Sequence, residues 1–226
     1  MNHMNFKILK ELQPSPLIAI LALTLGACVA TKQKTSKSPK ESEIILFDGK
    51  SLDSWEKTDF AGKGEIFIDK NGSLVLEMGA ELSGLHWKGE ALPTTNYEIS
   101  LQAKRTMGSD FFCGLTFPYK DTHATLILGG WGGSLIGISS LDDFDASENE
   151  TGDAFIFEDN QWYDVRLRVT NSEFTVWIDG KSVIDCEVEG RRVGMRPGEI
   201  EMSVPLGICT FATTGVFSAI HMKKLD

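Results

Sequence analysis

The sequence predicts an all-β domain built as a sandwich of two antiparallel sheets. Short runs rich in β-branched and aromatic residues recur about every ten residues, and turn residues separate them. Two of these runs, 97–104 and 162–169, alternate between apolar and polar side chains, as strands do when one face is buried. No stretch shows the 3.6-residue period of an amphipathic helix. Helix should therefore be a minor component.

The expected strands follow one another along the chain. An Asn-Gly pair at 71–72 predicts a tight hairpin between two of them. The run 111–117 is continuously apolar, which is typical of a strand covered on both faces. The runs 162–167 and 174–180 resemble the late hairpin of concanavalin-like jelly rolls. The expected strands are 44–47, 65–69, 73–78, 84–88, 97–104, 111–117, 124–128, 134–140, 162–169, 173–178, 182–186, 208–211 and 216–222.

Residues 1–27 are expected to be a lipoprotein signal peptide. A basic start precedes an apolar run, 16–25, which is too short to cross a bilayer because a spanning helix needs about 20 residues. The run ends in Leu-Gly-Ala-Cys, which resembles a bacterial lipobox with Cys28 as the lipid attachment site. Val29 after this cysteine indicates the outer membrane. A plain signal peptide with a coincidental cysteine is the alternative.

Residues 28–43 are expected to be a flexible linker, and residues 44–226 a single β-sandwich domain. The linker is rich in lysine, serine and threonine and has no apolar periodicity, so it cannot bury enough surface to fold. The protein is thus expected to be exported and anchored to the bacterial cell envelope. Its only membrane contact would be the N-terminal lipid.

The charge of the domain limits its ligands. Residues 44–226 carry 16 basic and 29 acidic side chains, a net charge of −13. Nucleic-acid binding needs a basic surface, so the composition argues strongly against it. Anionic substrates are disfavoured for the same reason, whereas neutral sugars are not.

Three cysteines remain after Cys28, and no two of them have metal-ligand spacing. Cys113, Cys186 and Cys209 each lie in a strand-like run, so they are expected to be buried free thiols. One disulfide among them is the alternative, because an exported protein meets an oxidising compartment.

The stretch 124–151 is the strongest candidate for a ligand site. Trp131 stands among four glycines between two expected strands, which favours an indole shelf beside bare main chain. An acidic loop follows, with Asp142, Asp145, Glu148 and Asn149 among its polar residues. Calcium or another divalent cation could bind here, since calcium takes six to eight oxygen ligands, with Asp142 and Asp145 among the possible ones. The alternative is a core tryptophan and a solvated acidic loop.

One basic cluster stands out in this acidic domain. Residues 191–196 contain three arginines. They could contact a sugar or a partner, or pair with neighbouring acids, which contributes only about 0–1 kcal/mol for an exposed pair.

The domain resembles a known family at its opening and beyond. The opening run is Leu46-Phe47-Asp48-Gly49-Lys50-Ser51-Leu52-Asp53-Ser54-Trp55. It closely resembles the first motif of the 3-keto-disaccharide hydrolase family, and the Trp131 hairpin, the run 139–151 and the last strand are also similar to this family. At the family strand before the ligand face, Gly108-Ser109-Asp110-Phe111 stands in place of Gly-Asn-Ser-Gly. The resemblance implies a concanavalin-like jelly roll that processes glycosides.

The activity that this resemblance implies is cleavage of 3-keto-glycosides. A 3-keto group acidifies the hydrogen on C2, so a base can remove it, the aglycone can leave C1, and water can add back. The protein must supply a base, donors for the enolate oxygen and an acid for the leaving group. The candidate bases are His86, His123, Asp145 and Glu148.

The candidate sugar-binding residues are Trp131, Trp87, Phe117, Asn149 and Glu77. The aromatic side chains would stack on sugar rings, and the polar ones would bind hydroxyl groups. Two hypotheses remain open: a glycoside hydrolase or lyase acting on 3-keto sugars, and a noncatalytic carbohydrate-binding module of a surface lipoprotein. Trp55 in the opening motif is expected to be a core anchor.

Overall fold

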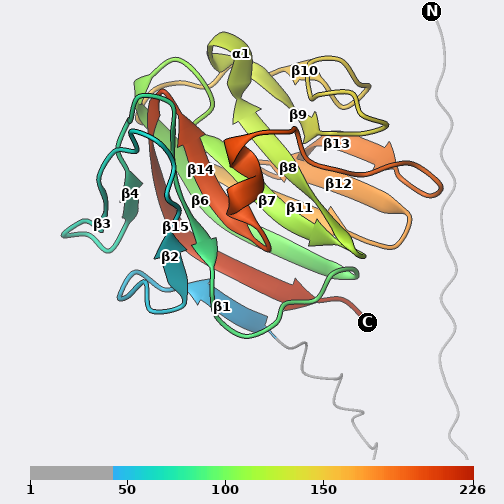
Figure 1. The fold of residues 1–226 in the computed structure, drawn as a ribbon, viewed down its shortest axis with the longest axis horizontal. Helices are drawn as coiled ribbons and strands as arrows, with labels where there is room; N and C mark the ends of the chain where they lie inside the picture. Colours follow the sequence, from blue (N-terminus) through green and yellow to red (C-terminus); the bar gives the residue numbers. More distant parts are fainter. Residues whose placement is uncertain (1–42) are drawn as a thin grey trace, which may run out of the picture. The chain divides into compact units, whose positions relative to one another are not determined.

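A computed structural model describes residues 43–226, which form two antiparallel sheets packed face to face (Figure 1). Sheet A has the order β13 (Lys181–Glu187), β12 (Glu173–Ile178), β11 (Tyr163–Val169), β6 (Tyr97–Gly108), β15 (Thr213–Lys224), β4 (Leu74–Leu76) and β3 (Ile66–Ile68), and β1 (Glu43–Phe47) pairs with β15. Sheet B has the order β10 (Asp153–Ala154), β9 (Leu135–Ser139), β8 (Thr122–Gly129), β7 (Cys113–Tyr119), β14 (Gly207–Phe211), β5 (Leu82–Trp87) and β2 (Trp55–Lys57). The jelly-roll sandwich predicted from the sequence is confirmed.

Two short helical turns accompany the sheets, α1 (Gly130–Gly133) and η1 (Glu199–Ser203). Each expected strand forms, and the hairpins β3–β4 and β11–β12 pair as predicted. The sequence analysis missed β2, β10 and η1. The expected signal peptide, Cys28 and the expected linker up to residue 42 lie outside the described residues, and Glu43, predicted as the last linker residue, belongs to β1. Within 43–226, no helix is long and apolar enough to cross a membrane.

The main core lies between the two sheets. Alternation along β6 and β11 buries one side of each strand, and the aromatic rings of both sheets meet there; Phe117 of β7, for example, meets Phe174 of β12 edge-on at 5.2 Å. Trp55 is buried and donates its indole N–H to the carbonyl oxygen of Leu46 at 2.8 Å. The predicted core anchor in the opening motif is therefore confirmed.

The three cysteines of the domain are buried free thiols, as expected. Burial raises the pKa of the Cys209 thiol to about 12 and moves the pKa of Cys113 in the same direction. Since the thiolate is the reactive form, neither thiol is a nucleophile near neutral pH.

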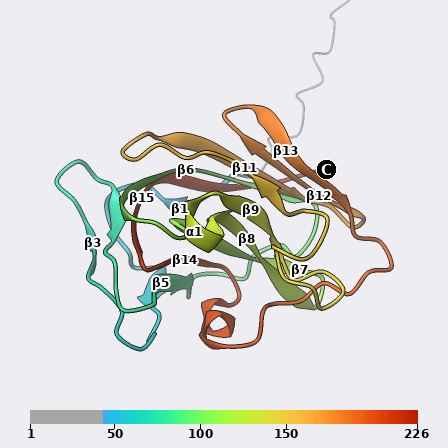
Figure 2. The ribbon, with the colours of Figure 1, turned by 90° about the horizontal axis from the view of Figure 1, so that it is seen from above.

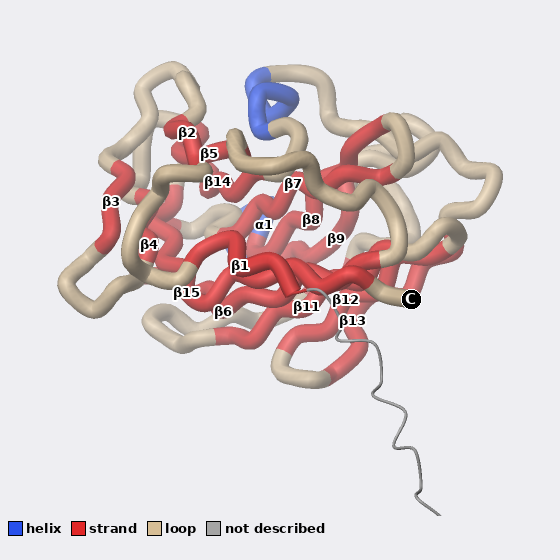
Figure 3. The backbone as a smooth tube through the Cα atoms, turned by 90° about the horizontal axis from the view of Figure 1, so that it is seen from below, coloured by secondary structure: helices blue, strands red, loops and turns tan. Residues whose placement is uncertain are grey.

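The outer face of sheet B, away from sheet A, carries a second apolar layer. η1 lies on this side of the sheet in both views turned from Figure 1 (Figures 2 and 3). Beneath it a satellite cluster packs separately from the main core. Its buried members are Phe60, Leu82, Phe111, Ile127, Ala146 and Cys209. This layer forms the floor of the candidate site.

Candidate functional site

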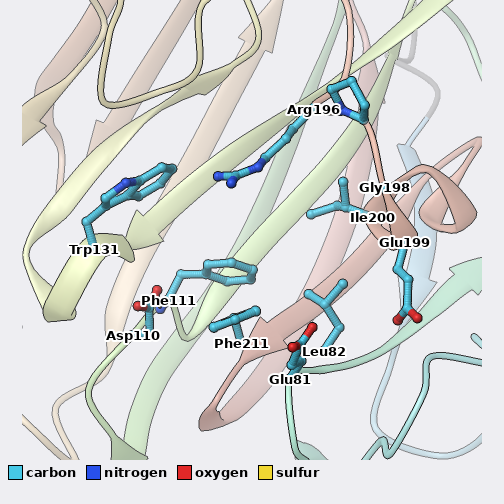
Figure 4. Close-up of a pocket in the computed structure, with 11 residues that line it drawn as sticks. Glu81, Leu82, Asp110, Phe111, Trp131, Arg196, Gly198, Glu199, Ile200 and Phe211 are labelled. Atoms are coloured by element: carbon cyan, nitrogen blue, oxygen red, sulfur yellow. Dashed lines mark hydrogen bonds between the residues drawn. The ribbon is translucent and has the colours of Figure 1, made fainter.

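A cleft of about 450 Å³ opens on the outer face of sheet B, between α1 and η1 (Figure 4). Apolar side chains form its floor and charged side chains stand at its rim. Its lining residues are Glu81, Leu82, Asp110, Phe111, Trp131, Arg196, Pro197, Gly198, Glu199, Ile200 and Phe211. The cleft lies within the volume range of ordinary small-molecule sites, about 300–1,000 Å³.

Trp131 forms one wall of this cleft. Its backbone is left-handed, with φ of 49°, and Gly132 continues the left-handed turn with φ of 89°. This turn follows β8 and holds the indole 45% exposed, at the end of the strand rather than between the sheets. The geometry of the expected shelf is therefore present, while sugar binding by Trp131 stays a prediction.

The glycines around Trp131 mostly serve the packing of the protein itself. A Cβ atom at Gly129 would lie 3.0 Å from the Phe112 ring, and one at Gly137 would lie 3.0 Å from Ala146. Gly132 alone in this turn has open space around its missing side chain. Bare main chain is thus available to a ligand at one position, not along the whole hairpin.

The acidic loop bends back onto the basic cluster, while Asp143 and Glu148 stay exposed. Arg191 binds Asp142 at 2.8 Å and also binds Glu150, and Arg192 binds Asp143 at 2.7 Å. The backbone N–H of Arg192 is the main cause that lowers the pKa of Asp142, and the Arg191 side chain adds to it. The open alternative that the arginines pair with neighbouring acids is confirmed.

Asn149 holds the loop together from inside. Its amide nitrogen donates to the carbonyl oxygens of Ile138 and Asp145 at 2.8 Å each, and its amide oxygen accepts from the backbone N–H and the hydroxyl of Thr151. These bonds use the hydrogen-bonding capacity of a primary amide. The prediction that Asn149 binds substrate is wrong, because its side chain is committed to the fold.

Asp145 lies beside the cleft and holds one of its walls. One carboxylate oxygen accepts from the Ser139 hydroxyl at 2.5 Å, and the other binds Arg196 at 2.6 Å. The guanidinium of Arg196 points towards Trp131 and lies 5.9 Å from the ring centre (Figure 4). A small cavity of about 50 Å³ next to the cleft reaches from Trp131 to Asp145 and Thr125. Glu148 is exposed on the loop and lines neither space.

The two candidate histidines lie apart on the same outer face of sheet B. His86 in β5 lies in the same row of paired residues as Thr125 in β8, three strands away, so the Cα atoms of His86 and Thr125 lie about 14 Å apart. His123 is two residues before Thr125 in β8 and is therefore at least as far from His86. The Nδ1 atom of His86 lies 2.9 Å from the Thr58 hydroxyl. Burial lowers the pKa of both His86 and His123. Neither histidine lines the cleft. The structure does not gather the four predicted bases at one point.

Two of the predicted stacking residues are wrong because they face the core. Trp87 is 7% exposed, meets Trp55 edge-on at 5.3 Å and donates its indole N–H to Glu90. Phe117 is fully buried between the sheets. Alternation along β5 and β7 explains this, because each of the two residues shares a strand face with core leucines. Glu77 is exposed next to β4 of sheet A, outside the cleft.

Asp142 and Asp145, the two possible metal ligands, are bound to arginines. Both carboxylate oxygens of Asp142 bind the 191–192 segment, and Asp145 binds Arg196. Among residues 43–226, no group of three or more His, Cys, Asp or Glu side chains converges in a way that could hold a metal ion. These two aspartates therefore do not fit a calcium site in this arrangement, and the cation stays a prediction.

The sequence analysis missed the carboxylates that do line the cleft. Asp110 accepts the backbone N–H of Phe111 at 2.8 Å and that of Gly132 at 3.4 Å. Glu81 has no side-chain hydrogen bond or ion pair within the described domain. Asp110 stood in the family strand before the ligand face, which is the signal that could have found it. Glu81 carried no such signal.

The comparisons with solved structures agree with the fold. The Crh5 transglycosylase in complex with NAG matches with a TM-score of 0.55 and 11% identity over 81% of this chain and 84% of that chain. A sialidase matches with a TM-score of 0.52 and 11% identity over 82% of this chain and 18% of that chain. The carbohydrate binding module CBM66 from Bacillus subtilis matches with a TM-score of 0.49 and 12% identity over 76% and 96% of the two chains. At these identities the likeness to the transglycosylase and the sialidase shows the fold alone, and the likeness to CBM66 adds nothing to it.

The comparison with protein families shows more than the fold. No curated protein matches the chain. Residues 42–207 match the family described as the 3-keto-alpha-glucoside-1,2-lyase-like domain, which spans most of the sequence. This match agrees with the resemblance found at the opening motif, and it supports a carbohydrate-related function. The chain belongs to the 3-keto-disaccharide hydrolase family.

Proposed function

We propose that the protein cleaves the glycosidic bond of 3-keto-glycosides in the cleft beside Trp131. The observation that carries the proposal is the meeting of an exposed indole, a guanidinium and two carboxylates without a cationic partner in 43–226 around one cleft. An aromatic face suits the apolar side of a sugar ring, and the charged rim suits its hydroxyl groups. Family membership supports the choice of substrate.

The proposed reaction is an elimination followed by hydration. A base takes the proton from C2, the electron pair forms a C1–C2 double bond, and the C1–O bond breaks. The aglycone leaves as an alcohol after it receives a proton. Water then adds its oxygen to C1 while C2 regains a proton. The net change is hydrolysis to a 3-keto sugar and an alcohol, with no oxidant or reductant.

The roles follow from the position of each charged group. We assign Asp110 as the base, because it lies at the Trp131 end of the cleft and carries no cationic partner within 43–226. Arg196 would bind the keto oxygen and stabilise the negative charge that develops there. Asp145 and Ser139 act as positioning residues, since Asp145 binds Arg196 and Ser139 donates its hydroxyl to Asp145. Glu81, at the opposite end of the cleft, is the candidate acid for the leaving group (Figure 4).

The test is to incubate the purified protein with a 3-keto-glucoside and to measure the released alcohol. Wild-type protein should release alcohol and 3-keto sugar in equal amounts, and added chelator should show whether a cation takes part. Asp110→Asn should lose turnover and still bind the substrate. Binding without any turnover of several 3-keto-glycosides would overturn the catalytic proposal.

A noncatalytic carbohydrate-binding module is the second candidate. The observation that favours it is the state of Asp145, the one predicted base near the cleft, which is held by Ser139 and Arg196 rather than free. This candidate expects no product from any keto sugar. It also expects Trp131→Ala to weaken sugar binding.

We also propose that the protein is exported and anchored to the bacterial cell envelope, in the outer membrane, through a lipid on Cys28. Support comes from the sequence of residues 1–29, which lie outside the described residues. Radiolabelled palmitate should enter the wild-type chain in bacteria and should not enter Cys28→Ala. Equal labelling of both chains would contradict the anchor.

A further inference from the structure

We infer that the cleft selects glycosides whose leaving group, the aglycone, is apolar, and this inference rests on the proposed function. The two ends of the cleft differ in chemistry (Figure 4). Trp131, Asp110 and Arg196 surround one end. Leu82, Ile200 and Phe211 surround the other. Phe111 lies between the two groups.

The apolar end is part of the satellite cluster on the outer face of sheet B. Leu82 and Phe111 are buried members of this cluster, and Ile200 and Phe211 pack against it while keeping part of their surface open to the cleft. The rings of Phe111 and Phe211 lie 5.8 Å apart. A sugar ring needs one aromatic face and many polar partners. This end offers two rings and two aliphatic side chains, with the carboxylates of Glu81 and Glu199 beside them (Figure 4).

The dimensions and the charge of the cleft narrow the class of aglycone further. A volume of about 450 Å³ leaves room for a substituent beside one sugar ring. The carboxylates Glu81, Asp110 and Glu199 line the cleft against a single cation, Arg196, which Asp145 already binds. Phosphate, sulfate or carboxylate groups on the aglycone would meet like charge. An uncharged alkyl or aryl group would not be repelled by these carboxylates.

The experiment compares hexyl and methyl 3-keto-glucosides, whose leaving groups are both primary alkoxides of similar basicity. Each buried methylene group contributes about 0.8 kcal/mol, so burial of two of the five extra groups gives about a tenfold higher kcat/KM for the hexyl compound. Ile200→Asn should reduce this ratio to about twofold, because the hexyl compound loses more kcat/KM than the methyl compound. Met202→Asn is the matched control, because Met202 is exposed on the same turn of η1 and does not line the cleft.

The outcomes separate this inference from the proposed function. Equal kcat/KM values for the two compounds, or an equal loss for both in Ile200→Asn, would overturn the inference and leave the proposed function intact. If neither compound is cleaved, the proposed function fails, and hexyl and methyl glucoside are titrated against the indole fluorescence of the wild-type protein. Binding about tenfold tighter for the hexyl compound then supports the apolar site, and equal binding excludes it.

Discussion

Two groups of acidic side chains lie near the outer face of sheet B, and they are used in different ways. In the loop 141–151, Asp142, Asp143, Asp145 and Glu150 are all bound to arginines. In the cleft, the Asp110 side chain binds only backbone N–H groups, and the Glu81 side chain has no hydrogen bond or ion pair within 43–226. The dense cluster thus stabilises the fold, while the two isolated carboxylates remain available to a ligand.

The largest expected effect tests this difference at the level of chemistry. Asp110→Asn removes the proposed base and keeps an acceptor for the backbone N–H groups, so kcat on a 3-keto-glucoside should fall about 10²–10⁴-fold. Glu148→Gln, in the loop, should leave kcat unchanged. Circular dichroism spectra of both variants serve as the folding control. If Glu148→Gln lowers kcat and Asp110→Asn does not, the catalytic base lies in the acidic loop and not in the cleft.

The second prediction tests the structural role of the loop. Asn149→Ala removes bonds to Ile138, Asp145 and Thr151 and leaves buried backbone groups unpaired, so the free energy of unfolding should fall by roughly 2–4 kcal/mol. Asp143→Ala breaks an ion pair whose two side chains are more than 70% exposed, and should cost less than about 1 kcal/mol. Urea unfolding measures both. Equal losses would mean that the loop is not held from inside.

The difference between the two regions also explains what the sequence could predict. Strand alternation identified the sandwich and the buried Trp55, because burial of one face follows from a local period of two. The same period places Trp87 and Phe117 on the strand faces of Leu85 and Leu115, which are buried in the core. They were predicted to stack on sugar rings only because their side chains are aromatic. Their real surroundings depend on which face of each strand meets the other sheet.

The cleft itself depends on contacts that no local pattern carries. Glu81, Asp110 and Glu199 come together because the segments before β5 and β7, the turn α1 and η1 lie around one end of the strands of sheet B. The same is true of Arg196, whose position is fixed by Asp145, 51 residues earlier in the chain. Trp131 could be predicted because its glycine turn is local. Its carboxylate partners could not.

The third prediction separates two exposed tryptophans. Trp131→Ala should weaken binding of the substrate or of its unoxidised glycoside about tenfold, since a stacked ring contributes about 0.5–1.5 kcal/mol beyond its buried area. Trp162→Ala is the matched control, because Trp162 is also partly exposed but lies against Lys104, away from the cleft. Isothermal titration measures both. Similar losses in the two variants would show binding that is not confined to the cleft.

The smallest expected effect concerns His86, which lies on the same sheet face but outside the cleft. Burial lowers its pKa below the ordinary value of 6.5, so the unfolded chain binds more protons than the folded one between the folded pKa and 6.5. The free energy of unfolding should therefore fall as the pH drops from 7.5 through 6.5, and the fall should end below the folded pKa. His86→Gln should make this fall smaller in urea titrations. The pH profile of kcat/KM should not change, and a changed profile would place His86 in the reaction instead of the carboxylates of the cleft.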